Sequence, residues 1–354
     1  MEKEQHQNHL QNHQQGINQV NQLQQAAQGQ MTGGMWLLTK EDWMLIRPDK
    51  SKKQSIEDVK QANSVAKFIK MFAEEFEYYF SDMLKLGSQT NIKAQVFYHR
   101  IKALKRNQQL DDNLYAITCL FLAAKLDDTL FKSEMCVEFY IALQHYLKVD
   151  ATFKPHAFKG LVSISKLDER AKALRKQTLK QIIEQIPKLK IQQEKAKLLH
   201  AESDILLSFG YDFVVDTALP YVDQFVKSYK EQINKQKEQM EQKKQKEEAK
   251  QEGEMKQETQ QDDKVESIEK LLNTVQFWGN DVYRSNLCLY YTPIQLTLTV
   301  LKKAQQTERV VFPDYAGQPW WKFFNEKYNA NIQSEDDFKE PLMYFNNIIA
   351  MLKS

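Results

Sequence analysis

Apolar residues recur every three or four positions along much of the chain, which is the spacing of one face of an α-helix. Over residues 63–76 this face is formed by Val65, Phe68, Ile69, Phe72, Ala73 and Phe76, with lysines and glutamates opposite. The same pattern returns over residues 91–104, where Asn91 is a suitable N-cap. We therefore predict two amphipathic helices, each with one buried face.

The third predicted helix is apolar on nearly all sides. It opens with Asp111 and Asp112, whose negative charges are stabilised by the positive end of the helix dipole. Residues 114–124 then offer almost no polar face. Because such a helix has to be surrounded by other helices, we expect it at the centre of the first domain.

Two more helices, over residues 133–147 and 194–209, complete five helices for this domain, and Gly210 can end the last one in a left-handed conformation. The segment 157–190 precedes that last helix and carries an excess of positive charge. We interpret it as a basic insertion. Its cations are Lys159, Lys166, Arg170, Lys172, Arg175, Lys176 and Lys180.

After Gly210 the helical pattern resumes over residues 211–229, 265–280, 287–305 and 338–352. The stretch between the first two, residues 227–264, holds ten lysines and ten acidic residues among glutamines. This charged insertion is either a solvated helix held by pairs of opposite charge or plain coil. A coiled coil is disfavoured because apolar positions at heptad spacing are missing, apart from Ile233 and Met240.

Residues 1–34 consist largely of Gln, Asn and His and have little to bury, so we expect a disordered tail. Its histidines, His6, His9 and His13, are better explained by low-complexity composition than by a metal site.

The composition supports an all-α fold. Only 10 Gly and 8 Pro occur in 354 residues, which disfavours β-sandwiches, barrels and glycine-loop enzymes. The length fits two compact domains. The isolated cysteines Cys119, Cys136 and Cys288 match neither a zinc ribbon nor a disulfide framework, which favours a reducing compartment.

The net charge of +2 predicts no general attraction to nucleic acid or anionic membranes. The longest apolar run is too short to cross a bilayer, and the N-terminus lacks a signal-peptide pattern. Phosphate-binding glycine loops, HExxH and GxSxG are missing from the sequence, as are the kinase signature motifs. We expect a soluble, intracellular and non-catalytic protein without cofactor or metal.

Four stretches together resemble the cyclins, in particular the transcriptional branch with cyclins T, K and L. The resemblance covers residues 36–325 apart from the two insertions, and a glutamate eight residues before the closing glycine, Glu202 before Gly210, also fits it. The stretches are Trp36-Leu37-Leu38-Thr39-Lys40-Glu41 with Arg47-Pro48-Asp49; Val96-Phe97-Tyr98-His99-Arg100; residues 119–128 (CLFLAAKLDD); and residues 287–293 (LCLYYTP) with Pro319-Trp320-Trp321.

The resemblance implies two cyclin boxes, each a five-helix bundle around a buried third helix. The first would span residues 35–210 with its lead-in and basic insertion, and the second residues 211–354 with the charged insertion. Cyclins activate a cyclin-dependent kinase by pressing its αC helix inward. The implied protein is therefore a nuclear regulatory subunit that forms a heterodimer with a kinase acting on the RNA polymerase II tail.

The resemblance also implies the residues of a kinase-binding site. Lys125 and Glu202 correspond to the pair that bonds to the kinase backbone, while Phe121 and Tyr211 correspond to positions that pack on the kinase. Tyr211 replaces the family's usual Phe. Asp127 and Asp128 stand where the family usually has glutamates. The substrate-docking Met-Arg-Ala-Ile-Leu patch of cell-cycle cyclins has no counterpart in residues 64–76, which favours the transcriptional role.

Simpler interpretations of these residues stay open. Lys125 ends an apolar helix, where a cation is stabilised by about 0.3 to 1 kcal/mol against the dipole, and Glu202 can pair with any nearby lysine. His99 fits a packed or surface histidine better than a metal ligand. Trp320 and Trp321 fit the core.

Two other functions also stay open. One is an adaptor for nucleic acid or transcription factors that uses the basic segment 159–180, and the other is a helical scaffold without a kinase.

Overall fold

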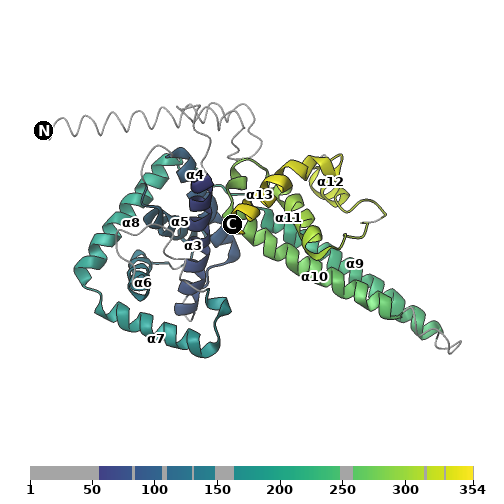
Figure 1. The fold of residues 1–354 in the computed structure, drawn as a ribbon, viewed down its shortest axis with the longest axis horizontal. Helices are drawn as coiled ribbons and strands as arrows, with labels where there is room; N and C mark the ends of the chain where they lie inside the picture. Colours follow the sequence, from purple (N-terminus) through teal and green to yellow (C-terminus); the bar gives the residue numbers. More distant parts are fainter. Residues whose placement is uncertain are drawn as a thin grey trace. The chain divides into compact units, whose positions relative to one another are not determined.

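The computed structural model describes residues 56–81, 84–105, 110–129, 131–147, 163–247, 258–314, 317–330 and 332–353. In these ranges the chain consists of α-helices, short 3-10 helices and connecting loops, with no β-strand (Figure 1). The predicted all-α class is confirmed. The Gln-rich tail, its three histidines and the lead-in at residues 36–49 lie outside the described ranges.

The chain divides into two compact units. The first extends to Asp216 and also includes Tyr283–Tyr290, whereas the second consists of Thr217–Val282 and Tyr291–Ser354. The division falls a few residues after the boundary predicted at 210. The sequence pattern did not predict that residues 283–290 belong with the first unit.

The first unit contains six α-helices in its described part, with the short helix η3 (Ile164–Lys166) before the fifth. All five predicted helices are present, and a sixth lies in the basic segment. The helices are α3 (Ile56–Tyr79), α4 (Ser88–Leu104), α5 (Asp112–Leu126), α6 (Ser133–Tyr146), α7 (Glu169–Gln185) and α8 (Lys188–Ser208).

Three helix starts in the first unit come earlier than predicted, and α3 begins at Ile56 rather than at residue 63. The N-cap of α4 is Gly87, not Asn91, because Ser88, Gln89 and Thr90 already adopt helical conformation. Similarly, α8 begins at Lys188, directly after Pro187, whose extended backbone serves as the N-cap. The residues added at the start of α4 are polar, whereas those added at the start of α8 include the apolar Leu189 and Ile191.

Helix α5 is the centre of the first unit, as its apolar sequence predicts. It packs against α3, α4, α6 and α8, and its residues from Ala116 to Ala124 are all buried. Its N-cap is Asp111, whose carboxylate accepts a hydrogen bond from the backbone N–H of Leu114 at 3.1 Å. The acidic opening of this helix therefore interacts with the dipole, as predicted, and also provides the N-cap.

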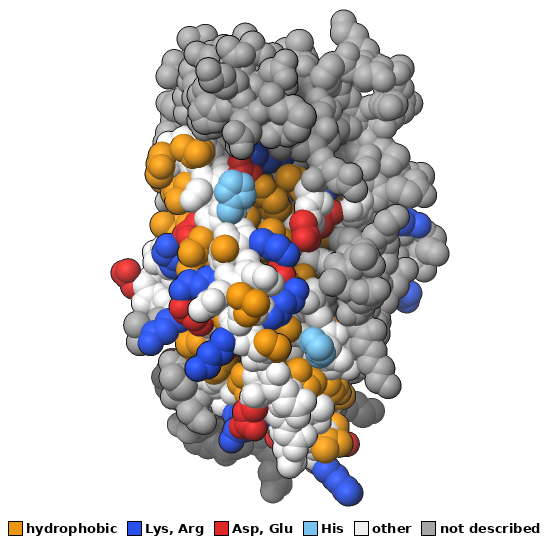
Figure 2. Space-filling model, turned by 90° about the vertical axis from the view of Figure 1, so that its left-hand side faces the viewer, with side chains coloured by type: hydrophobic (Ala, Val, Ile, Leu, Met, Phe, Trp, Pro, Cys, Tyr) orange, Lys and Arg blue, Asp and Glu red, His pale blue; other side chains and the backbone are white. Residues whose placement is uncertain are grey.

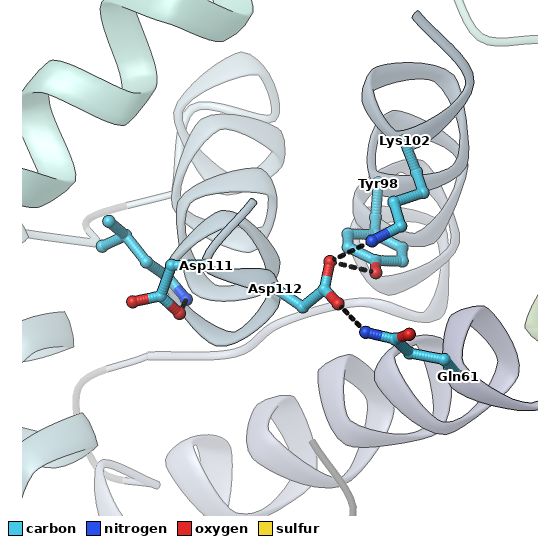
Figure 3. A network of polar contacts seen from close by, with 6 residues as sticks. Gln61, Tyr98, Lys102, Asp111 and Asp112 are labelled. Atoms are coloured by element: carbon cyan, nitrogen blue, oxygen red, sulfur yellow. Dashed lines mark hydrogen bonds and ion pairs between the residues drawn. The ribbon is translucent and has the colours of Figure 1, made fainter. Parts of the chain in front are cut away.

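The second acid of this opening, Asp112, is buried and joins three helices (Figure 3). Its carboxylate accepts hydrogen bonds from Tyr98 at 2.9 Å and Lys102 at 2.8 Å, both on α4, and from Gln61 on α3. Burial, followed by the charge of Asp112, raises the pKa of Tyr98 well above its usual value. Tyr98 therefore stays a neutral donor to this carboxylate.

Helix α7, from the segment interpreted as an insertion, is anchored in the first unit. Its Arg175 forms a buried ion pair with Glu75 of α3, and its Leu179 belongs to the hydrophobic core. The Arg175 guanidinium also lies 5.6 Å from the ring centre of Tyr146. Burial raises the pKa of Glu75 even though Arg175 opposes this shift. The side of α7 that carries Arg175 and Leu179 therefore packs into the first unit.

The second unit is helical too, with the described helices α9 (Ala218–Glu247), α10 (Glu258–Asp281), α11 (Pro293–Glu308), α12 (Lys322–Tyr328) and α13 (Lys339–Lys353) and the short helix η6 (Glu335–Phe338). Its α11 packs against α9, α10 and α13. Trp320 and Trp321 are buried, as expected for core residues. Rings of Phe225, Phe312, Trp320, Phe323 and Phe324 form its aromatic core.

Helices α9 and α10 lie side by side and extend away from the rest of the second unit (Figure 1). They approach closely at Gly279, where a side-chain carbon would lie 3.3 Å from Leu219. Both helices continue into the charged stretch 227–264. Of the two interpretations left open for this stretch, the structure shows helix over residues 227–247 and 258–264.

The segment 283–290 reaches α4 of the first unit. The buried His99 ring makes a 3.0 Å hydrogen bond, through Nε2, with the carbonyl oxygen of Tyr283, and the short helix η5 (Asn286–Leu289) packs against α4. Burial lowers the pKa of His99 to about 4, although the Tyr283 carbonyl favours the protonated ring. His99 is therefore a packed histidine, as the sequence favoured. Next to it, Arg100 donates two hydrogen bonds of 3.1 Å to the carbonyl of Val214.

The buried pair on α7 leads to a stability prediction. We expect Arg175→Met to lower the free energy of unfolding by about 3 to 5 kcal/mol, because it leaves the Glu75 carboxylate buried without its partner. The double variant Glu75→Leu/Arg175→Met should recover most of this loss. Urea unfolding followed by circular dichroism measures both. A small effect of Arg175→Met alone would show that α7 is not anchored through this pair.

His99 should make stability depend on pH. Its pKa is lower in the folded chain, about 4, than its ordinary value of 6.5, so the unfolded chain binds more protons between these values. Stability should therefore be fully present above pH 6.5 and fall by about 3 kcal/mol as the pH drops to 4. Urea unfolding at several pH values tests this, and His99→Gln should flatten the slope in this window. An unchanged slope in the variant would assign the pH dependence to other groups.

Candidate functional site

Two of the predicted site residues meet on the surface of the first unit. Lys125 lies in the last turn of α5, and Glu202 lies on α8, which packs against α5. The Lys125 ammonium donates a hydrogen bond to Glu202 Oε1 at 2.6 Å. The simpler interpretation of Glu202, a pairing with a nearby lysine, therefore also holds, and the lysine is Lys125 itself.

The two partners differ in exposure. The side chain of Glu202 is 9% exposed, whereas that of Lys125 is 50% exposed. An ammonium carries three N–H donors. Among the residues that the structure describes, the two donors of Lys125 not used by Glu202 have no partner. Glu202 thus holds a half-exposed ammonium in one place while leaving part of its bonding capacity toward solvent.

The Lys125 ammonium lies over the aromatic ring of Phe121. The ring centre lies 5.2 Å from Lys125 Nζ, which is within the range of a cation–π contact. Phe121 is only 5% exposed and packs against Phe131 with ring centres 5.9 Å apart. Its role in the free chain is to fix the end of α5, and direct packing on a kinase stays a prediction.

The two aspartates after α5 have different surroundings. The carboxylate of Asp127 accepts a hydrogen bond from Thr90 at 2.6 Å and forms an ion pair with Lys93, so it ties the end of α5 to α4. Asp128 is exposed and has a positive φ of 52°. Within the described chain, Asp127 is already committed to internal contacts, whereas Asp128 marks the turn that ends the helix.

Tyr211 is another exposed residue of the predicted site. Gly210 and Tyr211 adopt left-handed conformations, with φ of 56° and 62°, and the N–H of Tyr211 bonds to the carbonyl of Leu206 at 3.1 Å. The predicted left-handed end of this helix at Gly210 is confirmed. Tyr211 is 66% exposed, and no described contact joins its ring to the pair.

Three apolar residues near the pair were missed by the sequence interpretation. Leu126 follows Lys125 directly and is exposed. On α8, Leu199 stands three positions before Glu202 and is exposed, and Leu206 stands four positions after it and is half-buried. The signal was present, because positions three and four apart share one side of a helix. Together with the pair, these leucines make up a mixed apolar and charged surface, which we call the Lys125 surface.

In the described ranges no cluster of three or more His, Cys, Asp or Glu is arranged to hold a metal ion. Among the helices that the structure describes, none combines the length and the apolar character needed to cross a bilayer. The three cysteines are free, and burial raises the pKa of Cys119, Cys136 and Cys288. These thiols are poorly placed to act as nucleophiles.

Comparison of the chain with protein-family models and with curated proteins gave no match to either.

The exposure of Lys125 predicts that it contributes little to the stability of the free chain. We expect Lys125→Ala to change the free energy of unfolding by less than about 1 kcal/mol, because a half-exposed ion pair is screened by water. Urea unfolding of the variant measures the change. A loss of several kcal/mol would instead identify Lys125 as a structural residue.

Proposed function

We propose that this chain is the regulatory subunit of a cyclin-dependent kinase, of the transcriptional cyclin type, acting on the RNA polymerase II tail. The observation that carries the proposal is the ion pair between Lys125 and Glu202. The resemblance to cyclins singled out these two residues, which are 77 positions apart, and they lie in contact on the surface of the first unit.

The order of the helices adds support. A cyclin box surrounds a buried third helix, and α5, the third described helix of the first unit, is enclosed by α3, α4, α6 and α8. A sixth helix, α7, is additional to the family's pattern. The sequence resemblance at residues 287–293, which begins in the first unit and ends in the second, and at residues 319–321 of the second unit also supports the proposal.

The Lys125 surface suits the backbone of a partner helix. An ammonium held in place can donate to the carbonyl groups that remain unpaired at a helix C-terminus, while a carboxylate accepts from exposed N–H groups. Leu126, Leu199 and Leu206 provide apolar contacts beside the pair. The side chains of the Lys125–Glu202 pair are already held in place. Binding of a partner helix there would therefore cost little of their conformational entropy.

Activation then follows from differential binding. A kinase with its αC helix inward would meet both the pair and the apolar residues, whereas an outward helix would lose these contacts. The cyclin stabilises the inward state only by the difference between these two affinities. The chemistry of phosphoryl transfer stays with the kinase and its metal ions.

Capture of the kinase tests this proposal. The tagged full-length chain is purified from its own cells, the proteins that co-purify are identified by mass spectrometry, and phosphorylation of a polymerase-tail peptide is assayed. We expect a stoichiometric kinase. Lys125→Ala and Glu202→Ala should each weaken its binding by about 1 to 3 kcal/mol, because hydrogen bonds at a buried interface lose one partner.

Lys105→Ala is a matched control. Lys105 forms an ion pair with Asp204, two positions after Glu202 on α8, and comes from α4 rather than from α5. This variant should retain the kinase. Equal kinase recovery with both Lys125→Ala and Glu202→Ala, or recovery of nucleic acid or a polymerase complex without a kinase, would contradict the proposal and favour the adaptor function.

A further inference from the structure

The outer surface of α7 and the start of α8 is not used by the proposed kinase site. Residues 163–200 contain ten Lys and Arg but four Asp and Glu, an excess of six positive charges in a chain whose net charge is +2. Figure 2, which faces the side of the first unit where α8 lies in Figure 1, shows Lys and Arg side chains with hydrophobic side chains between them. Positive charge is therefore concentrated in this segment.

Half of these cations form ion pairs within the fold. Arg175 pairs with Glu75, Lys172 with Glu169, Lys195 with Glu134, and Lys190 and Lys197 share Glu194. The other five have no carboxylate partner among the residues that the structure describes, and they are Lys166, Arg170, Lys176, Lys180 and Lys188. Lys176 instead lies over the ring of Tyr78, 5.7 Å from its centre.

Two exposed leucines lie among these unpaired cations. Leu174 is 64% exposed and follows Arg170 by one helical turn on α7, and Leu189 is 65% exposed and follows Lys188 directly on α8. The opposite side of α7 is anchored by Arg175 and Leu179. The helix therefore presents Arg170, Leu174 and Lys180 on a face that is held in place and uncovered, which we call the α7 surface.

The chemistry of the α7 surface identifies its partner class. Four of the five unpaired cations are lysines, whose point charges attract anions without requiring a fixed geometry, and the exposed leucines favour a partner that covers them with apolar side chains, which a bare phosphate backbone lacks. Bases of single-stranded nucleic acid stack on aromatic rings, and the exposed residues of α7 include none. We propose that the α7 surface binds an acidic amphipathic segment of another protein, in which Asp and Glu flank apolar residues.

A synthetic peptide probes this directly. A fluorescein-labelled helix-forming peptide, with leucines every third or fourth position among glutamates and aspartates, is titrated with the full chain and followed by anisotropy. We expect binding that weakens as salt is raised. The double variant Arg170→Glu/Lys180→Glu should weaken it at least about tenfold, which corresponds to about 1.4 kcal/mol, and Leu174→Ser should weaken it at low and high salt alike.

The matched control is Lys67→Glu/Lys85→Glu, which makes the same change in net charge at two exposed positions of the first unit outside α7. It should bind the peptide like the unchanged chain. A thymidine homopolymer and vesicles of anionic phospholipid are tested in parallel. The proposal is overturned if the peptide does not bind, if the control variant loses as much affinity as the α7 variant, or if the homopolymer or the vesicles bind through Arg170 and Lys180 while the peptide does not.

This proposal does not depend on the kinase. Circular dichroism of each variant tests whether the exposed substitutions leave the fold intact. The α7 variants should still recover the kinase, because neither Lys125 nor Glu202 lies on α7. If the peptide does not bind while the kinase is recovered, only the α7 proposal fails. If the kinase is lost while the peptide binds, only the kinase proposal fails.

Discussion

The first unit depends on how the buried carboxylate of Asp112 is satisfied. A charged group in a protein interior is tolerated only when its hydrogen-bonding capacity is met, since an unpaired buried charge costs several kcal/mol. Tyr98 and Lys102 of α4 and Gln61 of α3 meet it, and the N-terminal end of α5 adds its dipole. One side chain thus sets the position of three helices relative to one another. At the other end of the same helix, the packing of α5 on α8 brings Lys125 to Glu202.

The basic segment shows a second use of a buried charge. Arg175 and Glu75 neutralise each other inside the fold, so α7 can pack although most of its surface is polar. The cost of burying both groups limits what this pair adds to stability, but removing either one would leave the other stranded. Such a pair also specifies which side of the helix faces inward, and it leaves the remaining cations outside.

The first unit consequently carries two surfaces of different chemistry. The Lys125 surface is built from a half-exposed ion pair and neighbouring leucines, which suits the backbone and apolar side chains of a partner helix. The α7 surface combines unpaired cations with exposed leucines, which suits an acidic segment. In the proposed complex, the first would control the kinase and the second would bring in another protein.

Local chemistry was sufficient to predict five helices of the first unit, the central place of α5 and the left-handed end at Gly210, but α7 and α12 were not predicted. Hydrophobic spacing, caps and glycine conformation act over a few residues, so they can be read along the chain. The burial of Asp112, the Arg175–Glu75 pair, the anchoring of α7 and the return of residues 283–290 to the first unit were decided by tertiary structure. Each joins groups distant in the sequence, and helical periodicity says which side of a helix is buried but not which helix covers it. Lys125 and Glu202 lie between these cases, since the cyclin resemblance singled them out and only the packing of α5 on α8 joins them.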